Sequence, residues 1–486
     1  CIRDRIKTAF LIAKQNEGMK CVFILFLLKN KNDVSYCETK GVRFYMCAVG
    51  VKTDLESILN QEKIKEKHEA GIYGNGADMI VYPTTEEEIS QILKYAHDNR
   101  KKIVIEGNGS KRGFGGTVET YDICLSLRDY CGIVEHAAGD MTITVKAGTP
   151  FQEVQTYLKK ENQRISMDPY SLQAGTVGGI IASNDSGPRR LSYGSARDSV
   201  IGMRVIYPDG TCIRCGGKVV KNVAGYDMNK LFIGSMGTLA VVTEVTFKTK
   251  PTAKFESVMC ITVPEKEGKQ LKDLAIRLLD SVMEPISLQY VTCATSKKLL
   301  GVSGPTLVVS FEDVESSVHY EENFVKSQLS KDAQVVIKSQ QDAEQFWLAM
   351  MALAPIVKEK TEDENHITVA MKIGVKNLDV IDIMEYCEVI SYENQIEIHA
   401  HGGLGHGLCE VYLTGKMQQV IDNISRLAQK AEVLGGHYTI KHAPLSVRRS
   451  INTWQKHEGT FALMQGIKKA CDPNGILNEK RFVGGI

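Results

Sequence analysis

The sequence predicts a mixed α+β fold in two successive domains that are followed by a short C-terminal segment. At 486 residues the chain is too long for one hydrophobic core, which rarely serves more than about 250–300 residues. The first half alternates short β-branched runs with amphipathic helices and glycine-rich loops. Beyond about Pro251 the pattern changes to strands alternating with charged helices that contain few glycines. These two patterns place one α+β domain after another.

The first predicted unit is a strand, a helix and a second strand. In TEEEISQILKYAHDNR, four apolar residues starting at Ile89 recur at i, i+3, i+4 and i+7, and Thr85 with Glu88 matches a capping box. The flanking runs DMIVYP and KKIVIEG are β-branched and short, which is typical of strands. This order indicates the unit of a parallel sheet.

The remaining elements of the first half follow the same rules. MTITVKAG predicts a strand, and FQEVQTYLKKE predicts a helix with an apolar face. VIGMRVIYPDGTCIRCGG predicts a hairpin that turns at Pro208, Asp209 and Gly210. AVVTEVTFKTKP predicts the strand that closes this half.

We expect four regions along the chain. Residues 1–45 form an extension, which we expect to be disordered or an upstream translation artefact because the chain begins with Cys. A first domain covers 46–252, an α+β cap domain covers 253–445, and a segment with a helix and a turn covers 446–486.

The net charge and the cysteine pattern indicate which partners and which cellular compartment the protein is expected to have. Lys plus Arg total 59 and Asp plus Glu total 58, so no basic field favours nucleic acid. The 13 cysteines have no repeating spacing, which fits reduced thiols, and we interpret the close pair Cys212 and Cys215 as ordinary thiols rather than a metal or redox pair. The early apolar run CVFILFLL is far shorter than the ~20 residues that span a bilayer. We therefore expect a cytoplasmic protein with no integral membrane segment, with peripheral attachment at the inner face of the membrane as an alternative.

Two glycine-rich segments predict an anion-binding site. The strand KKIVIE runs into GNGSKRGFGG, and a second segment reads QAGTVGGIIASNDSGPRRLSYGSARDSVIG. Clustered glycines let backbone N–H groups approach a phosphate without an intervening Cβ. A mobile turn explains the first segment alone and a strained structural loop at a domain junction explains the second, but two such segments in one domain favour a phosphate-containing ligand.

These segments carry a resemblance. Followed by GSMGTLAVVTEVTFK, they resemble the FAD-binding PCMH-type domain of the vanillyl-alcohol oxidase flavoprotein superfamily, and GGKVVKNVAGYDMNKLFIGSMGTL resembles the FAD-binding subunits of glycolate oxidase (GlcE-like). The similarity returns at the C-terminus in DPNGILNEKRF. It implies a two-subdomain FAD-binding domain, a cap that holds the substrate and a C-terminal helical segment that returns to the FAD domain.

The resemblance also assigns FAD contacts. Matched residue by residue, they fall on Gly107, Asn108, Gly109, Ser110 and Lys111 in the first loop, and on Asp168, Pro169, Thr176, Val177, Gly178, Gly179, Ser183, Gly187 and Val242. Covalent members of the superfamily attach flavin through a His or Cys near these loops. Neither residue occurs in 107–119 or 169–198, so we expect non-covalent FAD.

The catalytic half departs from the better-known relatives. Where D-lactate-oxidising members carry HxGDGNxH, this chain reads HAHGGLGHGL, with Leu404 in place of the Asp and Leu408 in place of the second His. The later LGGHYTIKHAPL contains His437 and His442 but no Glu partner. A catalytic metal normally needs three protein ligands, so we expect no metal here.

Other side chains remain candidates for catalysis. Alternation along a strand places His399 and His401 on one face, and we take His401 as the candidate base. Arg189 or Arg190 could clamp a substrate carboxylate in bidentate fashion.

The resemblance implies FAD-dependent oxidation of a small 2-hydroxy acid of the glycolate or D-lactate type. The chain would be the FAD-binding subunit of a glycolate oxidase-like complex, with a GlcD-like flavoprotein and an iron–sulfur subunit as partners. Two alternatives stay open: a non-catalytic FAD-binding subunit for assembly or electron transfer, and a stand-alone FAD-linked D-lactate dehydrogenase. The chain contains no CxxCxxC segment, so electrons would leave through another protein or a diffusible acceptor.

Overall fold

The computed structural model describes residues 46–68, 71–219, 225–357, 366–455 and 458–486. The predicted extension 1–45 lies outside the described residues. Helix α1 (Met46–Glu56) comes first, and the chain divides after Val51 into two units. The unit from Lys52 to Ile486 contains every element discussed below. In the described part of the chain, no helix is long and apolar enough to cross a membrane.

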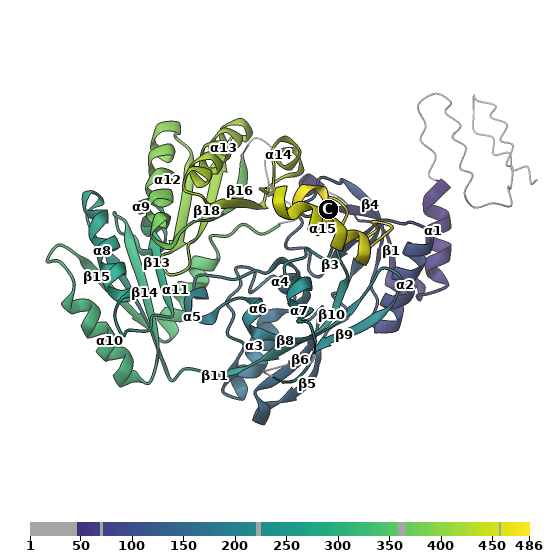
Figure 1. Ribbon diagram of the computed structural model, residues 1–486, viewed down its shortest axis with the longest axis horizontal. Helices are drawn as coiled ribbons and strands as arrows, with labels where there is room; N and C mark the ends of the chain where they lie inside the picture. The colour runs from purple at the N-terminus through teal and green to yellow at the C-terminus, as the bar shows by residue number, and fades with distance from the viewer. Residues whose placement is uncertain (1–45, 69–70, 220–224, 358–365, 456–457) are drawn as a thin grey trace, which may run out of the picture. The chain divides into compact units, whose positions relative to one another are not determined.

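A four-stranded sheet with the order β1-β2-β4-β3 begins this unit (Figure 1). Its strands are β1 (Ile64–His68), β2 (Gly76–Val81), β3 (Ile103–Glu106) and β4 (Thr120–Ser126). The predicted helix is α2 (Glu86–Asp98), and its capping box and buried face are both confirmed. The strands on either side of α2 are parallel, as predicted, although β4 lies between them.

A second, antiparallel sheet has the order β5-β6-β10-β8-β9. Its strands are β5 (Ile133–Ala137), β6 (Thr142–Lys146), β8 (Val200–Ile206), β9 (Cys212–Gly216) and β10 (Val241–Lys248). The predicted hairpin is confirmed as β8 and β9, and the predicted helix is α3 (Phe151–Lys160). Shorter elements complete this part: β7 (Gln163–Arg164) pairs with β11 (Lys250–Pro251), and the helices are α4 (Val177–Ser183), α5 (Arg190–Tyr193), α6 (Ala196–Ser199) and α7 (Asn229–Phe232).

The second half forms one antiparallel sheet of eight strands in the order β15-β12-β14-β13-β17-β18-β16-β19, which we call the cap sheet. Its strands are β12 (Phe255–Thr262), β13 (Ser287–Val291), β14 (Thr306–Asp313), β15 (Gln334–Ser339), β16 (Ile367–Gly374), β17 (Glu397–Gly403), β18 (Leu408–Gly415) and β19 (His437–His442). The helices between them are α8 (Gly268–Leu279), α9 (Cys293–Leu300), α10 (Glu315–Ser327), α11 (Gln341–Met351), α12 (Val380–Asn394) and α13 (Met417–Val433).

The two faces of the cap sheet have different coverings because successive side chains on a strand alternate. On β12, Met259 and Ile261 point to the core formed with α8, α10, α12 and α13, which lie on one side of the sheet (Figure 1). Val258 and Cys260 point the other way, toward Trp347 on α11. On the last four strands this second face is polar, and it positions the candidate site.

The C-terminal segment contains α14 (Leu445–Ser450) and α15 (Glu458–Cys471), and α15 is drawn in yellow in Figure 1. Leu477 forms a parallel bridge with Ile103 on β3, and the Lys468 ammonium donates to the Thr238 carbonyl at 2.8 Å. The chain therefore returns to its first sheet after completing the cap.

Candidate functional site

The first glycine segment follows β3 and lines a cavity of about 850 Å³ that is open to solvent. Close packing explains its glycines: a Cβ on Gly107 would lie 2.1 Å from Thr176 Oγ1, and Gly109 has a φ of +69°. Thr176 in turn caps α4, because its hydroxyl oxygen accepts from the Gly179 N–H. The two glycine segments that sequence analysis singled out therefore pack directly on each other.

Most of the residues predicted to contact FAD line this cavity. They are Gly107, Asn108, Gly109, Ser110, Lys111, Thr176, Gly178, Gly179, Ser183 and Val242. The walls combine glycine backbone and small apolar side chains with the cations Lys111, Arg112 and Arg481. Exposed backbone, apolar surface and positive charge in one cleft suit a dinucleotide with a pyrophosphate. The residues present thus fit FAD, and we call this cleft the FAD-side cavity.

Four of the predicted contacts lie elsewhere: Asp168, Pro169, Val177 and Gly187 are outside the residues lining this cavity. The Asp168 carboxylate accepts from the backbone N–H groups of Gly187 at 3.2 Å and Arg189 at 2.8 Å. A Cβ on Gly187 would lie 1.9 Å from the Asp168 carbonyl oxygen. These residues hold the second glycine segment against the loop that follows β7.

Sequence reasoning missed cavity residues that come from distant parts of the chain. Asn478 accepts from the Ile105 N–H at 3.0 Å and donates to the Met236 carbonyl at 2.7 Å, so it joins three wall segments. Arg481 donates to the Lys111 carbonyl at 2.9 Å. Both residues lie in the segment DPNGILNEKRF. The sequence showed that this segment resembles the family, but it did not assign a role to Asn478 or Arg481.

A second, open cavity of about 1240 Å³ adjoins the first, and Ser183 lines both. The polar face of the cap sheet borders it. Strand register places His401 opposite Glu410, Glu410 opposite Lys372, and Lys372 opposite Thr439, so one polar row crosses four strands. Lys372 and Thr439 line the cavity.

An ion network connects this row to the first domain. The Lys441 ammonium lies 2.8 Å from Glu410 Oε1 and 3.6 Å from Asp185 Oδ1, and the Lys111 ammonium lies 2.8 Å from Asp185 Oδ2. Burial alone would raise the pKa of the Asp185 carboxyl, but Lys111 and Lys441 together lower it. Asp185 therefore stays ionised. Its carboxylate links Lys111 in the first glycine segment to Lys441 in the cap sheet.

His401 is buried, with 1% of its surface exposed. Its Nδ1 lies 3.2 Å from Gln289 Oε1, and Tyr170 and Tyr412 flank its ring. Burial, with added repulsion from Lys441, lowers the pKa of His401 to about 3. The imidazole is therefore neutral at ordinary pH and a weak proton acceptor.

The other histidines of the region differ in access. His399 pairs with Tyr412 across the strands and lies on the same face as His401, as predicted, but its Nε2 contacts Glu397. Burial lowers the pKa of His406 to about 4. His442 lines a third cavity of about 450 Å³, which shares Ser110 and Lys111 with the FAD-side cavity. Its Nε2 lies 3.0 Å from the Tyr73 hydroxyl.

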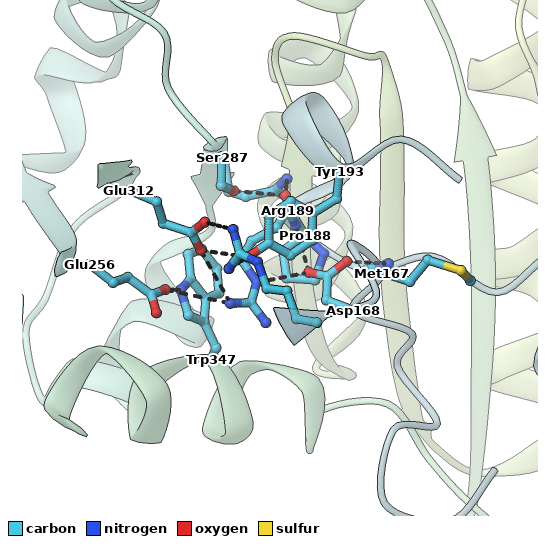
Figure 2. A network of polar contacts seen from close by, with 12 residues as sticks. Met167, Asp168, Pro188, Arg189, Tyr193, Glu256, Ser287, Glu312 and Trp347 are labelled. Carbon is cyan, nitrogen blue, oxygen red and sulfur yellow. Dashed lines mark hydrogen bonds and ion pairs between the residues drawn. The ribbon is translucent and has the colours of Figure 1, made fainter. Parts of the chain in front are cut away.

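Arg189 lies in a network of carboxylates rather than in a cavity wall (Figure 2). Its guanidinium contacts Asp168 at 3.4 Å, Glu256 on β12 at 3.5 Å and Glu312 on β14 at 3.8 Å. The Trp347 indole N–H donates to the same Glu256 at 2.9 Å, as Figure 2 shows. This placement favours a structural link between the second glycine segment and the cap over the substrate clamp that the sequence suggested.

Arg190 points to a different environment. Its Nη1 donates to the neutral Ser186 hydroxyl at 2.6 Å, and its positive charge contributes to the low pKa of His406 and Lys372. Because Ser186 lines the second cavity, the Arg190 guanidinium lies next to a residue of its wall, where a clamp for a carboxylate would be useful.

The close cysteine pair does not form one site, because Cys212 is exposed on β9 while Cys215 is buried. Among the described residues, the group with metal-ligand geometry is Glu265, Cys293 and Glu388, a set distinct from the histidines considered above.

The sequence is similar to known FAD-linked oxidases along most of its length. A model described as "FAD binding domain" matches residues 77–216, and one described as "FAD linked oxidases, C-terminal domain" matches 251–481. The Bacillus subtilis "Glycolate oxidase subunit GlcD" is 30% identical over 84% of this chain and 89% of its own length. A "D-lactate dehydrogenase" of Archaeoglobus fulgidus is 25% identical over 83% and 91%, respectively.

Solved structures show the same fold. A 4-ethylphenol oxidase from Gulosibacter chungangensis aligns with a TM-score of 0.69 and 14% identity, over 89% of this chain and 96% of that one. A p-cresol methylhydroxylase aligns with a TM-score of 0.69 and 13% identity over the same shares. The fold is thus the PCMH-type FAD-binding fold with a cap. The chain belongs to the FAD-linked oxidase family that includes the glycolate oxidase subunit GlcD, and it is an FAD-linked oxidoreductase with FAD as its cofactor.

Proposed function

We propose that this FAD-linked oxidoreductase oxidises a small 2-hydroxy acid, of the glycolate or D-lactate type, to the 2-oxo acid. The observation that carries the proposal is the cation-lined second cavity directly beside the FAD-side cavity. The relatives named for glycolate oxidation and for D-lactate dehydrogenation support the same class of substrate. Bound FAD supplies the hydride acceptor for such an oxidation.

The FAD-side residues hold the cofactor through the glycine backbone and the cations Lys111, Arg112 and Arg481. The predicted contacts Asp168, Pro169, Val177 and Gly187 act indirectly, by fixing the second glycine segment. The described residues lining this cavity include neither His nor Cys, which supports non-covalent attachment.

Removal of the hydroxyl proton needs a base with access to the substrate. We assign this role to His442, which lines a cavity adjoining the first glycine segment, in preference to His401, which does not line that cavity and has a pKa of about 3. Lys372, Lys441 and Arg190 provide the positive charge that orients an acid.

Dye-linked turnover tests the proposal. The purified FAD-loaded chain is given glycolate, D-lactate or L-lactate with an artificial electron acceptor, and the 2-oxo acid is identified. We expect turnover with glycolate or D-lactate. The absence of a 2-oxo acid from every substrate, with FAD bound, contradicts the proposal for the chain alone.

A second function is favoured by one observation. Leu404 and Leu408 stand where oxidising relatives carry Asp and His, and Leu404 is fully buried. The chain would then be an FAD-binding subunit for assembly or electron transfer beside a catalytic GlcD-like subunit and an iron–sulfur subunit. Turnover that appears only on addition of such partners favours the complex, whereas turnover by the chain alone favours a self-sufficient dehydrogenase.

A further inference from the structure

Lys372 is a lysine without a counter-ion at the edge of a cavity. It lies on β16, its side chain is half-buried, and it lines the open cavity of about 1240 Å³. Among the residues that the structure describes, none forms a hydrogen bond or ion pair with its ammonium group. Placing a charged amine in such a position costs solvation free energy, which a bound anion would restore.

The carboxylates nearest to Lys372 are already occupied. Glu410, its cross-strand neighbour, pairs with Lys441 at 2.8 Å. Asp185 pairs with Lys111 at 2.8 Å and with Lys441 at 3.6 Å. The two acidic side chains of the cluster are thus compensated by two lysines that are not Lys372.

Arg190, a second cation near Lys372, forms no ion pair within the described part of the chain. Its guanidinium donates to the neutral hydroxyl of Ser186 at 2.6 Å, and Asp198 and Asp168 attract it from beyond contact distance. Lys111 and Lys441, by contrast, contact Asp185 and Glu410 directly. Lys372 and Arg190 are therefore two neighbouring positive charges that no carboxylate of the described residues contacts.

Burial and repulsion from neighbouring cations lower the pKa of the Lys372 ammonium group. Burial contributes most, followed by repulsion from Lys441, and together they lower the pKa of Lys372 to about 8. A surplus of positive charge in a recess with low-dielectric walls concentrates anions. An arginine beside a lysine offers a planar donor pair and a point charge to a single carboxylate.

We propose that Lys372 and Arg190 together form the binding site for the carboxylate of the substrate, with Lys441 as an internal cation that keeps Glu410 and Asp185 from neutralising it. This inference rests on the proposed oxidation of a 2-hydroxy acid and assigns residues to its substrate site. Lys372 is then a specificity residue that requires an anionic substrate.

Binding of oxalate tests the site independently of turnover, because oxalate carries the carboxylate but has no hydroxyl-bearing carbon to oxidise. Calorimetric titration of the FAD-loaded chain gives its Kd. We expect Lys372→Met to raise this Kd by about tenfold to a hundredfold, since a charge-assisted contact is lost. Lys372→Arg retains the positive charge and should stay within about threefold of the native protein.

Lys376→Met is the matched control, because Lys376 is an exposed lysine just beyond the same strand. Its Kd should not change. FAD content and the unfolding midpoint show whether each variant is folded. Failure of the native protein to bind oxalate, native affinity in Lys372→Met, or an equal loss in Lys376→Met overturns the inference.

The pH dependence gives a second readout. The groups facing Lys372 are Arg190, Asp185, Glu410, Lys441 and His406. Because Lys372 is charged below its pKa, oxalate affinity should fall as the pH rises through about 8. Lys372→Arg should remove this step, and its persistence there contradicts the assignment.

The outcomes separate the two proposals. Lys372-dependent oxalate binding in a chain that oxidises no acid keeps the anion site and rejects the oxidation. Native KM for D-lactate or glycolate in Lys372→Met keeps the oxidation and rejects the role of Lys372.

Discussion

Two histidines near the polar face of the cap sheet differ in their position relative to the cavities. His442, 3% exposed, lines the cavity that shares Ser110 and Lys111 with the FAD-side cavity, whereas His401, 1% exposed, lines neither of these two cavities. Sequence alone favoured His401 as the base, because the alternation of a strand places residues on a face but does not reveal what covers that face.

We expect His442→Asn to lower kcat for acid oxidation by about 10²–10⁴-fold, the usual contribution of a positioned base. His401→Asn should retain kcat to within about tenfold, because its imidazole lies behind Tyr170 and Tyr412 and does not itself line the cavity that these tyrosines line. Dye-linked steady-state kinetics, with FAD content measured in parallel, compares the two variants. A larger loss in His401→Asn would reverse the assignment.

The buried His401 also predicts how stability depends on pH. Its pKa is about 3 in the folded protein and near the ordinary histidine value of 6.5 in the unfolded chain. The unfolded state therefore gains a proton first as the pH falls, and the free energy of unfolding decreases between pH 6.5 and 3. From pH 7.5 to 5 this one histidine should remove about 2 kcal/mol.

Urea unfolding at pH 7.5 and 5 measures this effect. His401→Asn should lose less stability over the interval than the native chain does. Acidic groups such as Asp185, whose pKa is lowered, lose their contribution only at lower pH, because a carboxyl with a depressed pKa stabilises the fold until it is protonated. Equal losses in the two proteins would show that His401 is not buried as described.

Arg189 shows how a residue with suitable chemistry can serve structure instead. A guanidinium after a glycine segment suggested a substrate clamp, but three carboxylates from β12, β14 and the segment before α4 surround it. Glu256 and Glu312 come from the other domain, at separations that local sequence patterns do not reveal.

Arg189→Met should lower the free energy of unfolding by about 3–5 kcal/mol, because it removes the cation that contacts Asp168 and Glu256, while Glu312 keeps its ion pair with Arg164. Arg426→Met is the control: Arg426 pairs with Glu393 at the surface, where an ion pair contributes about 1 kcal/mol or less. Chemical denaturation of both variants gives the comparison. Similar small changes in both would argue against the structural role.

At the scale of elements, the glycine segments depend on close contacts between loops. Gly107→Ala would place a methyl group 2.1 Å from Thr176 Oγ1 and displace the residue that caps α4. We expect this variant to purify with at least tenfold weaker FAD affinity, since the backbone can no longer approach the ligand. Gly139→Ala, at a position where a Cβ meets nothing within 4 Å, should retain FAD.

The FAD-to-protein absorbance ratio and fluorescence titration of the apoprotein measure both variants. If Gly107→Ala bound FAD with native affinity, the first glycine segment would not be part of the FAD site.

Local elements were the most predictable part of the fold. The capping box at Thr85, the buried face of α2 and the turn at Gly210 depend on residues within a few positions of one another, and each was confirmed. The insertion of β4 between the strands that flank α2 was not foreseen, because strand order depends on contacts between distant segments.

For the whole molecule, the order of the motifs was sufficient to predict the family. It was not sufficient to predict how the cap arranges its charged side chains. The eight-stranded cap sheet brings Lys372, Glu410 and Lys441 together from three strands, and Asp185 joins them from the first domain. In the sequence these charges are separated by tens of residues and resemble ordinary surface residues. The substrate side of the site therefore became visible only in three dimensions.

The most direct test of the account is anaerobic reduction of FAD bound to the purified chain, without any electron acceptor. On addition of glycolate or D-lactate, with L-lactate as the control, we expect the flavin absorbance near ~450 nm to bleach, because flavin is the hydride acceptor. Bound FAD that stays oxidised with both glycolate and D-lactate would contradict a self-sufficient oxidoreductase for these 2-hydroxy acids.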